Sequence, residues 1–173
     1  DTLIDYPVMY HPEEVNYYLK RDFFREYSAN GSLFLSENCS LKDCDNLIIY
    51  GHHMNSGKMF AALEGYRERK FFKEHPFIFF NTLQGEEKYQ VFAVFSTPVY
   101  TGSDFAYYTF TKAENRKSYE TFIEAVKERS FYDTGITADY GEKLLTLSTC
   151  EYSQENGRLD GVAKKIAEKE ITK

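Results

Sequence analysis

Thr146-Leu147-Ser148-Thr149-Cys150 closes an apolar run that begins at Leu144, and this stretch decides the interpretation of the rest of the chain. A cysteine at the end of a strand is held rigidly and can present its sulfur in a cleft. Arg158 follows eight residues later (158 minus 150) and begins the next run, so it can return beside Cys150 on a neighbouring strand. A fixed cation near a thiol favours the thiolate, which is the nucleophilic form.

A thiol used in this way needs a proton carrier, and Tyr50-Gly51-His52-His53-Met54 offers two candidates. Side chains alternate between the faces of a strand, so only one of the two histidines can face the cysteine. His52 and Cys150 are 98 positions apart (150 minus 52) and can meet only through the fold. Imidazole would act as general acid and base, and Arg158, which stays charged, would hold an oxygen of the substrate.

The composition limits the class of protein. The chain has 173 residues, enough for one domain, and no repeat or linker divides it. Its formal charge of −6 and the absence of a Lys/Arg block argue against nucleic-acid binding. Fifteen Tyr and fifteen Phe favour a β-rich fold with a groove, although a large aromatic core explains them equally well. No apolar run is long enough to span a membrane.

Short apolar runs separated by glycines and prolines predict a mostly β fold with peripheral helices. Strands are expected over residues 33–35, 47–50, 76–80, 89–95, 144–150 and 158–164. The run Tyr89–Phe95 is nearly all apolar, which predicts burial on both faces. Helices are expected from His11, over Met59–Tyr66, and over Ala113–Arg129, where apolar residues recur at helical spacing.

These stretches, taken together, resemble the sortases, most of all class B, whose typical signatures are Y-G-H-x-M and T-L-S-T-C with a downstream arginine. Ile4-Asp5-Tyr6-Pro7-Val8, Tyr17-Tyr18-Leu19 and Gly31-Ser32-Leu33-Phe34-Leu35 agree, so the resemblance covers nearly the whole chain. It implies a single catalytic domain over residues 1–173. The implied fold is a closed β-barrel of about eight strands, with a long helix between the two strands preceding the cysteine.

The resemblance implies a site and a reaction. Cys150, His52 and Arg158 become the catalytic residues, because the family places its histidine directly after the glycine. Cys150 would attack the amide after Thr in a C-terminal sorting signal of the N-P-x-T-G/N type and form a thioacyl enzyme. An amine would then resolve that intermediate. Ser148, Thr149 and Leu19 are expected to bind the substrate, with the loop from Tyr100 to Phe110 as a further groove wall.

The partners implied are a surface protein bearing the sorting signal and an amine acceptor, either a peptidoglycan precursor or a pilin lysine. No cofactor and no metal are expected. The implied location is the extracellular face of a Gram-positive cell membrane, through an N-terminal anchor that this chain does not include. A cysteine peptidase that releases its product to water, and a non-catalytic peptide-binding barrel, are the alternatives.

Two features stand apart from this pattern. Cys39 and Cys44 can pair in an oxidising setting or remain two unpaired loop cysteines. Asp160 and Gly161 lie inside the last expected strand, where class B chains usually continue with apolar β-branched residues. A glycine there indicates a bulge, and a buried aspartate needs partners. Both therefore affect where Arg158 points.

Overall fold

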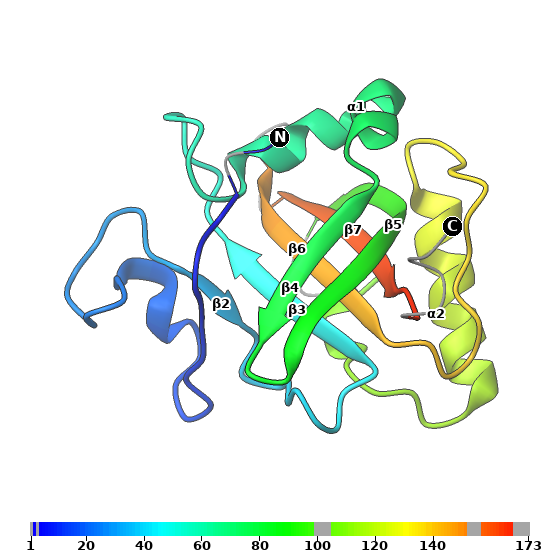
Figure 1. Ribbon diagram of the computed structural model, residues 1–173, viewed down its shortest axis with the longest axis horizontal. Helices are drawn as coiled ribbons and strands as arrows, with labels where there is room; N and C mark the ends of the chain where they lie inside the picture. Colours follow the sequence, from blue (N-terminus) through cyan, green and yellow to red (C-terminus); the bar gives the residue numbers. More distant parts are fainter. Residues whose placement is uncertain (1, 3, 99–104, 152–156, 168–173) are drawn as a thin grey trace.

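One curled sheet forms the centre of the molecule (Figure 1). The computed structural model describes residues 2, 4–98, 105–151 and 157–167, and for Cys150 and Glu151 it describes the backbone alone. Within these residues the strand order is β1-β2-β3-β6-β7-β5-β4. The bounds are β1 Val8–Met9, β2 Leu33–Leu35, β3 Asn46–Gly51, β4 Phe77–Thr82, β5 Gly85–Pro98, β6 Leu144–Glu151 and β7 Gly157–Lys165.

The prediction of a mostly β fold is confirmed, and the described sheet forms a half-barrel of seven strands rather than a closed barrel of eight. β1 and β4 are the two ends of the sheet order. β1 is only two residues long and follows Pro7, which has no N–H to continue a ladder. The curl therefore leaves its concave face to be covered by other segments.

Helical segments lie around the sheet. They are the 3₁₀ helices η1 (Tyr17–Lys20), η2 (Phe60–Arg67) and η3 (Tyr107–Thr109), and the α-helices α1 (Arg69–Glu74) and α2 (Arg116–Arg129). The helix predicted from His11 is wrong: only the 3₁₀ turn η1 forms there. Asn16 adopts a left-handed backbone with φ of 57°, which a continuous α-helix does not allow. The predicted Met59–Tyr66 helix is present as η2.

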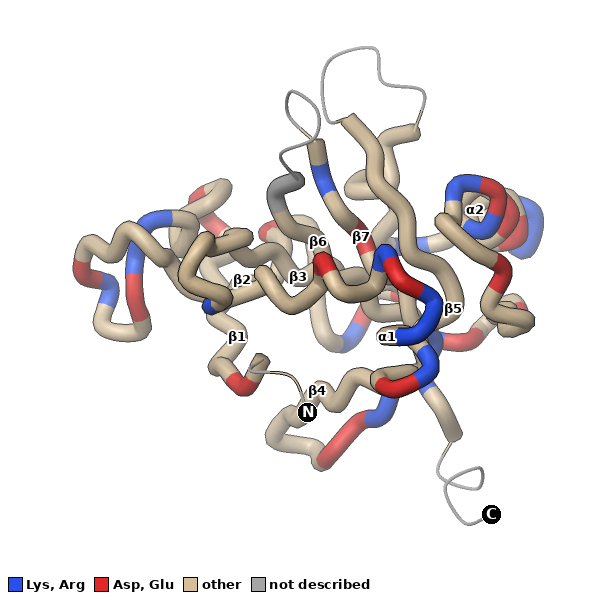
Figure 2. Tube along the Cα trace, turned by 90° about the horizontal axis from the view of Figure 1, so that it is seen from above, with Lys and Arg blue, Asp and Glu red and all other residues tan. Residues whose placement is uncertain are grey.

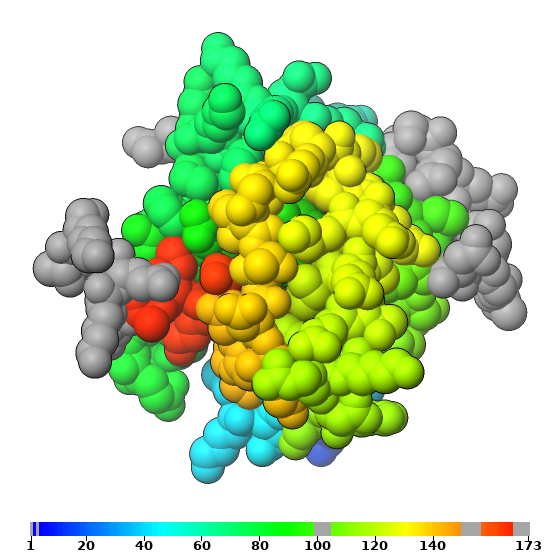
Figure 3. Space-filling view, turned by 90° about the vertical axis from the view of Figure 1, so that its right-hand side faces the viewer, coloured from blue at the N-terminus to red at the C-terminus, as the bar shows by residue number. Residues whose placement is uncertain are grey.

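Helix α2 connects β5 to β6 along the chain and packs against β5. It starts at Arg116, three residues after the predicted start, because Asn115 caps it and forms a reciprocal capping box with Ser118. Seen from above, α2 lies on the side of β5 that faces away from β6 and β7, and it carries charges of both signs (Figure 2). Figure 3 shows the side of the molecule that lies on the right in Figure 1. α2, in yellow-green, and the segment after it, in yellow to orange, cover much of this side.

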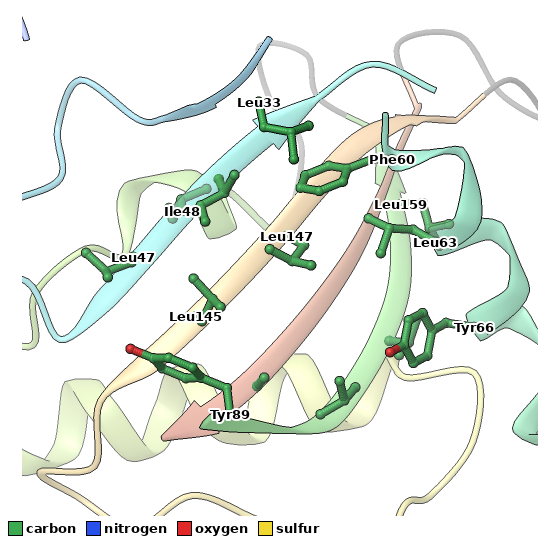
Figure 4. Packing of buried hydrophobic residues seen from close by; sticks show 14 of the residues in the cluster. Leu33, Leu47, Ile48, Phe60, Leu63, Tyr66, Tyr89, Leu145, Leu147 and Leu159 are labelled. Atoms are coloured by element: carbon green, nitrogen blue, oxygen red, sulfur yellow. The ribbon is translucent and has the colours of Figure 1, made fainter. Parts of the chain in front are cut away.

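The sheet separates two apolar cores. The larger one fills the concave side, where Ile48, Phe60, Leu147 and Leu159 converge from β3, η2, β6 and β7 (Figure 4). The second lies between the sheet and α2. Strand β5 contributes to both, because Val91 and Val94 join the first core and Phe92, Ala93 and Phe95 join the second. The predicted burial of Tyr89–Phe95 on both faces is confirmed.

The prediction of a membrane-anchored location is corrected to this extent: no N-terminal anchor is seen in the described residues. In the described ranges, no helix combines the length and the apolar character needed to cross a bilayer.

Candidate active site

The site lies where β3, β6 and β7 meet at one edge of the sheet. β3 and β6 run parallel, with Tyr50 opposite Ser148 and Gly51 opposite Thr149, so both strands end at the same edge. β6 and β7 are antiparallel, and their register places position 150 opposite Arg158. His52 directly follows the last residue of β3. The backbone thus brings the positions of His52, Cys150 and Arg158 onto three neighbouring strands; the Cys150 side chain lies outside the described part of the chain.

A backbone carbonyl of η1 orients the His52 side chain. Its Nε2 lies 2.7 Å from the carbonyl oxygen of Leu19, and because a carbonyl only accepts, Nε2 is the donor in this hydrogen bond. The backbone carbonyl of His52 accepts from the N–H of Phe60 at 2.9 Å. These two contacts fix both the imidazole ring and the chain that bears it.

Gly51 allows close packing around the end of β3, directly before His52. A Cβ at this position would lie 2.4 Å from a methyl of Leu33 and 2.7 Å from the Phe60 ring. Only a residue without a side chain allows β2 and η2 to pack this closely against the end of β3. The Y-G-H sequence therefore needs its glycine for packing just before the histidine.

Arg158 lies half-buried at the start of β7, and its Nη1 donates to the carbonyl of Gly157 at 3.1 Å. Burial raises the pKa values of Asp160, Tyr50 and Tyr107, and the positive charge of Arg158 opposes each of these shifts. The guanidinium therefore acts electrostatically on groups from β3, β7 and η3. An arginine in this place can attract an oxygen that gains negative charge.

A cavity of about 240 Å³ lies at this edge of the sheet. Five residues predicted from the sequence line it: Leu19, His52, Ser148, Thr149 and Arg158. His53 is not among the lining residues and instead forms an isolated β-bridge with Met59. A larger cavity of about 660 Å³ lies on the concave side, between residues 4–8 and the β4–β5 turn, and the described residues that line it include no His, Cys or Arg. The smaller cavity is therefore the candidate site.

The sequence analysis missed part of the cavity wall. Asn16, Glu37 and Tyr50 line it without having been predicted, whereas two further residues, Tyr107 and Tyr108, line it from η3. The last two belong to the predicted groove loop from Tyr100 to Phe110, of which residues 100–104 lie outside the described residues. Tyr50 is the first letter of the Y-G-H motif, and its register opposite Ser148 gives it this place.

A polar layer lies directly behind the cavity. The hydroxyls of Tyr107 and Ser148 are 2.7 Å apart, and Asp160, fully buried, is opposite Ser148 in the β6–β7 ladder. Burial raises the pKa of Asp160 to about 7, although the hydroxyls of Ser148 and Tyr107 and the charge of Arg158 lower it. Burial also raises the pKa of Tyr107 well above its usual range.

The other two cysteines are separate from this site. Cys39 and Cys44 are both buried and both free, so the alternative of a disulfide between them is not realised in the structure. Burial raises the pKa of the Cys39 thiol to about 12, which keeps it protonated at neutral pH.

Comparison with known proteins agrees with this geometry. A model of the sortase domain matches residues 4–166. The chain belongs to the sortase family. It is 34% identical over 169 residues to sortase B of Staphylococcus aureus, and 33% identical over 162 residues to sortase B of Listeria monocytogenes. These alignments cover 95% and 92% of this chain but 66% and 63% of the relatives, so the chain spans slightly less than two thirds of their length.

A solved structure supports the same assignment. The Staphylococcus aureus sortase B–substrate complex superposes with a TM-score of 0.86 at 33% identity, covering 96% of this chain and 76% of that one. The expected family is therefore confirmed by sequence and by fold, with class B sortases as the relatives on both counts.

Proposed function

We propose that this sortase is a cysteine transpeptidase of the class B type, with Cys150 as nucleophile, His52 as acid and base, and Arg158 as the oxyanion-stabilising group. The observation that carries the proposal is the register of three strands at one edge. Positions 150 and 158 are direct partners, β3 delivers His52 beside them, and His52 and Arg158 line one cavity.

The reaction runs in two halves through a thioester. In the first, the Cys150 thiolate attacks the amide carbonyl carbon, the oxygen gains negative charge beside Arg158, and the C–N bond breaks. The departing nitrogen takes a proton from His52. In the second half, an incoming amine gives a proton to His52 and attacks the thioester, and the thiolate leaves as the new amide forms.

The hydrogen bond to Leu19 assigns the imidazole nitrogens. Because Nε2 donates to that carbonyl, proton exchange with the reacting groups takes place at Nδ1. The carbonyl of Leu19 also stabilises the imidazolium, since it accepts from a ring that is more acidic when charged. Leu19 thus has a place both in the cavity wall and behind the histidine.

The substrate class is an extended peptide of the N-P-x-T-G/N type, cleaved after Thr. Ser148, Thr149 and Leu19 line the cavity and support binding of such a peptide. The acceptor is an amine on a cell-wall precursor. A pilin lysine and water are the competing acceptors, because all three attack the same thioester.

A peptide library tests this proposal. Peptides of the N-P-x-T-G/N form are incubated with the protein, with and without amine acceptors, and the products are identified by mass spectrometry. Cleavage after Thr, a thioacyl adduct on Cys150 and a product joined to the amine are expected. Cys150→Ala should lose at least about 10³-fold of the rate, in line with loss of a nucleophile. Cleavage that persists at full rate in Cys150→Ala contradicts the proposal.

A further inference from the structure

Asp160 is a buried carboxyl at the back of the candidate site. It is fully buried on β7, opposite Ser148 on β6 and opposite Phe95 on β5. Among the described residues, neither of its carboxyl oxygens makes a hydrogen bond of standard geometry. Burial raises its pKa, and the hydroxyls of Ser148 and Tyr107 oppose this rise only as donors outside that geometry. A buried polar group without such bonds lowers stability, so packing gives no reason for an aspartate here. A destabilising acid next to a reactive site is a candidate for function.

The surroundings of Asp160 are known from every element that packs against it. Ser148 on β6 and Tyr107 on η3 act on it with hydroxyls, and Arg158 on β7 brings a positive charge. Tyr50 on β3 is linked to it by charge alone: burial raises the pKa of Tyr50, and the charge of Asp160 adds to that rise. Glu37 acts at longer range, through its effect on Tyr50. From β5 the register partner is the apolar Phe95. Asp160 is not itself in the cavity wall, whereas Tyr50, Tyr107, Ser148 and Arg158 all are.

The Tyr107–Ser148 pair has two hydroxyl protons, and the state of Asp160 decides where they point. One proton lies between the two oxygens, which are 2.7 Å apart. When Asp160 is ionised, it accepts the second proton, because a carboxylate is an acceptor only. One proton then lies between the two hydroxyl oxygens and the other is donated to Asp160. Neither hydroxyl donates to the cavity, whichever of the two donates to the other. When Asp160 is neutral, it can donate to the pair, and one hydroxyl proton is released toward the cavity.

We propose that Asp160 is a positioning residue that sets whether the Ser148–Tyr107 pair offers a hydrogen-bond donor, or acceptors only, to a peptide in the cavity. This inference rests on the proposed function, because it assigns a peptide to that cavity. Under this proposal, Asp160 influences substrate binding although it does not line the cavity. It acts through the hydroxyls of Ser148 and Tyr107, which contact the substrate.

The neutral form of Asp160 is the productive one. When Asp160 is neutral, one hydroxyl of the Ser148–Tyr107 pair can donate to a peptide carbonyl. The charge of Arg158 also stays available for the oxygen that becomes negative in the reaction. The ionised form removes that donor and attracts the guanidinium. Burial raises the pKa of Asp160 to about 7, so the change between the two forms falls near neutral pH. Peptide binding and turnover should therefore decline as the pH rises through 7.

The test compares pH profiles of Asp160→Asn and the unchanged protein. Asparagine has nearly the same shape and cannot ionise. With a pKa of about 7, the neutral fraction of Asp160 falls roughly tenfold between pH 6 and pH 8. The loss of kcat/KM over this range should thus be up to about tenfold smaller in Asp160→Asn than in the unchanged protein. Asp160→Val is a second variant without an ionisable group and should show the same reduced loss.

Glu124→Gln is the matched control, since it removes one negative charge from the exposed face of α2. Its pH profile should follow that of the unchanged protein. Peptide affinity is measured in parallel in the Cys150→Ala background, with the library peptide that binds this variant most tightly. There the pH dependence of the Kd should be reduced when Asp160→Asn is added.

The binding arm separates the two proposals. If no peptide is cleaved but the Kd of the Cys150→Ala protein depends on pH through Asp160, the transpeptidase proposal fails and the role of Asp160 stands. If Asp160→Asn and Asp160→Val change kcat/KM and Kd by the same factor at every pH, Asp160 is merely structural and the inference is overturned. Equal profiles in all variants overturn it as well.

Discussion

Cys150 and Arg158 are direct cross-strand partners in the antiparallel ladder of β6 and β7. Opposed residues in such a ladder have Cβ atoms about 4.5–5.5 Å apart, which is a fixed distance set by the backbone rather than by a flexible loop. The sheet thereby determines where the arginine stands relative to the cysteine position. A rigid arrangement of this kind limits which substitutions of Arg158 can preserve its role.

Arg158→Lys should reduce kcat/KM by roughly 10²-fold, as expected for loss of a group that stabilises an oxyanion. Lysine keeps the charge but lacks the planar set of donors, and its ammonium is shorter in reach and differently aimed. Steady-state kinetics with the best library peptide measure the effect. A rate within twofold of the unchanged protein would reduce Arg158 to a background charge.

His52→Ala should lower kcat by roughly 10²–10⁴-fold, the usual contribution of a general acid and base. His53→Ala is the matched control: it removes the same side chain one position along the chain, outside the cavity wall. It should keep most of the activity. Single-turnover formation of the thioacyl enzyme compares the two, and the opposite ranking would mean that the wrong imidazole has been assigned.

Gly51→Ala should destabilise the protein by about 1–3 kcal/mol, the usual cost of overpacking. The new methyl group would overlap Leu33 and Phe60, and these side chains must move to admit it. Because His52 is the next residue, activity should fall together with stability. Urea unfolding measures the free energy of unfolding. Gly57→Ala tests glycine replacement at a site where no atom lies within 4 Å of the new carbon, although its positive φ adds strain of its own.

Asp160→Asn should stabilise the protein increasingly as the pH rises. The pKa of Asp160 is raised in the folded state from 3.8 to about 7, so the folded protein holds this proton more tightly than the unfolded chain. This tighter proton binding adds to the free energy of unfolding below pH 4, and the added free energy is lost as the pH rises to 7. The full loss is roughly 4 kcal/mol at most, at about 1.4 kcal/mol for each pKa unit.

Urea unfolding at pH 4, 6 and 8 provides the measurement. The gain of Asp160→Asn over the unchanged protein should grow from pH 4 to pH 6 and grow again, by a smaller amount, from pH 6 to pH 8. A gain that is constant with pH would show that Asp160 is already ionised, or stays neutral, across this range.

The sequence predicted those features that depend on local pattern. The strands and the α2 periodicity follow from short stretches, because strand and helix periods are visible within a few residues. The choice of His52 over His53 came from the family resemblance. The prediction that residues 52, 150 and 158 share one site came from the resemblance to the sortases. The left-handed Asn16, which ends the expected helix before η1, has no comparable local signal, since asparagine also occurs within helices.

The polar layer behind the cavity was less predictable, because it depends on tertiary register. Asp160 was recognised as unusual in a strand, but its partners follow from which residue lies opposite it in β6. Tyr107 reaches Ser148 from 41 positions away, out of a segment with no recognisable motif. Pattern along the chain does not reveal such a pairing.

The parallel pairing of β3 with β6 has a consequence for how this protein folds. Asn46 and Leu144 are partners although 98 positions separate them (144 minus 46), and the loop between them must close before any bond of this ladder forms. Pairings of such high contact order are slow to appear in a folding reaction. The candidate site should therefore form late in the folding reaction, once the segments around residues 46 and 144 have found each other.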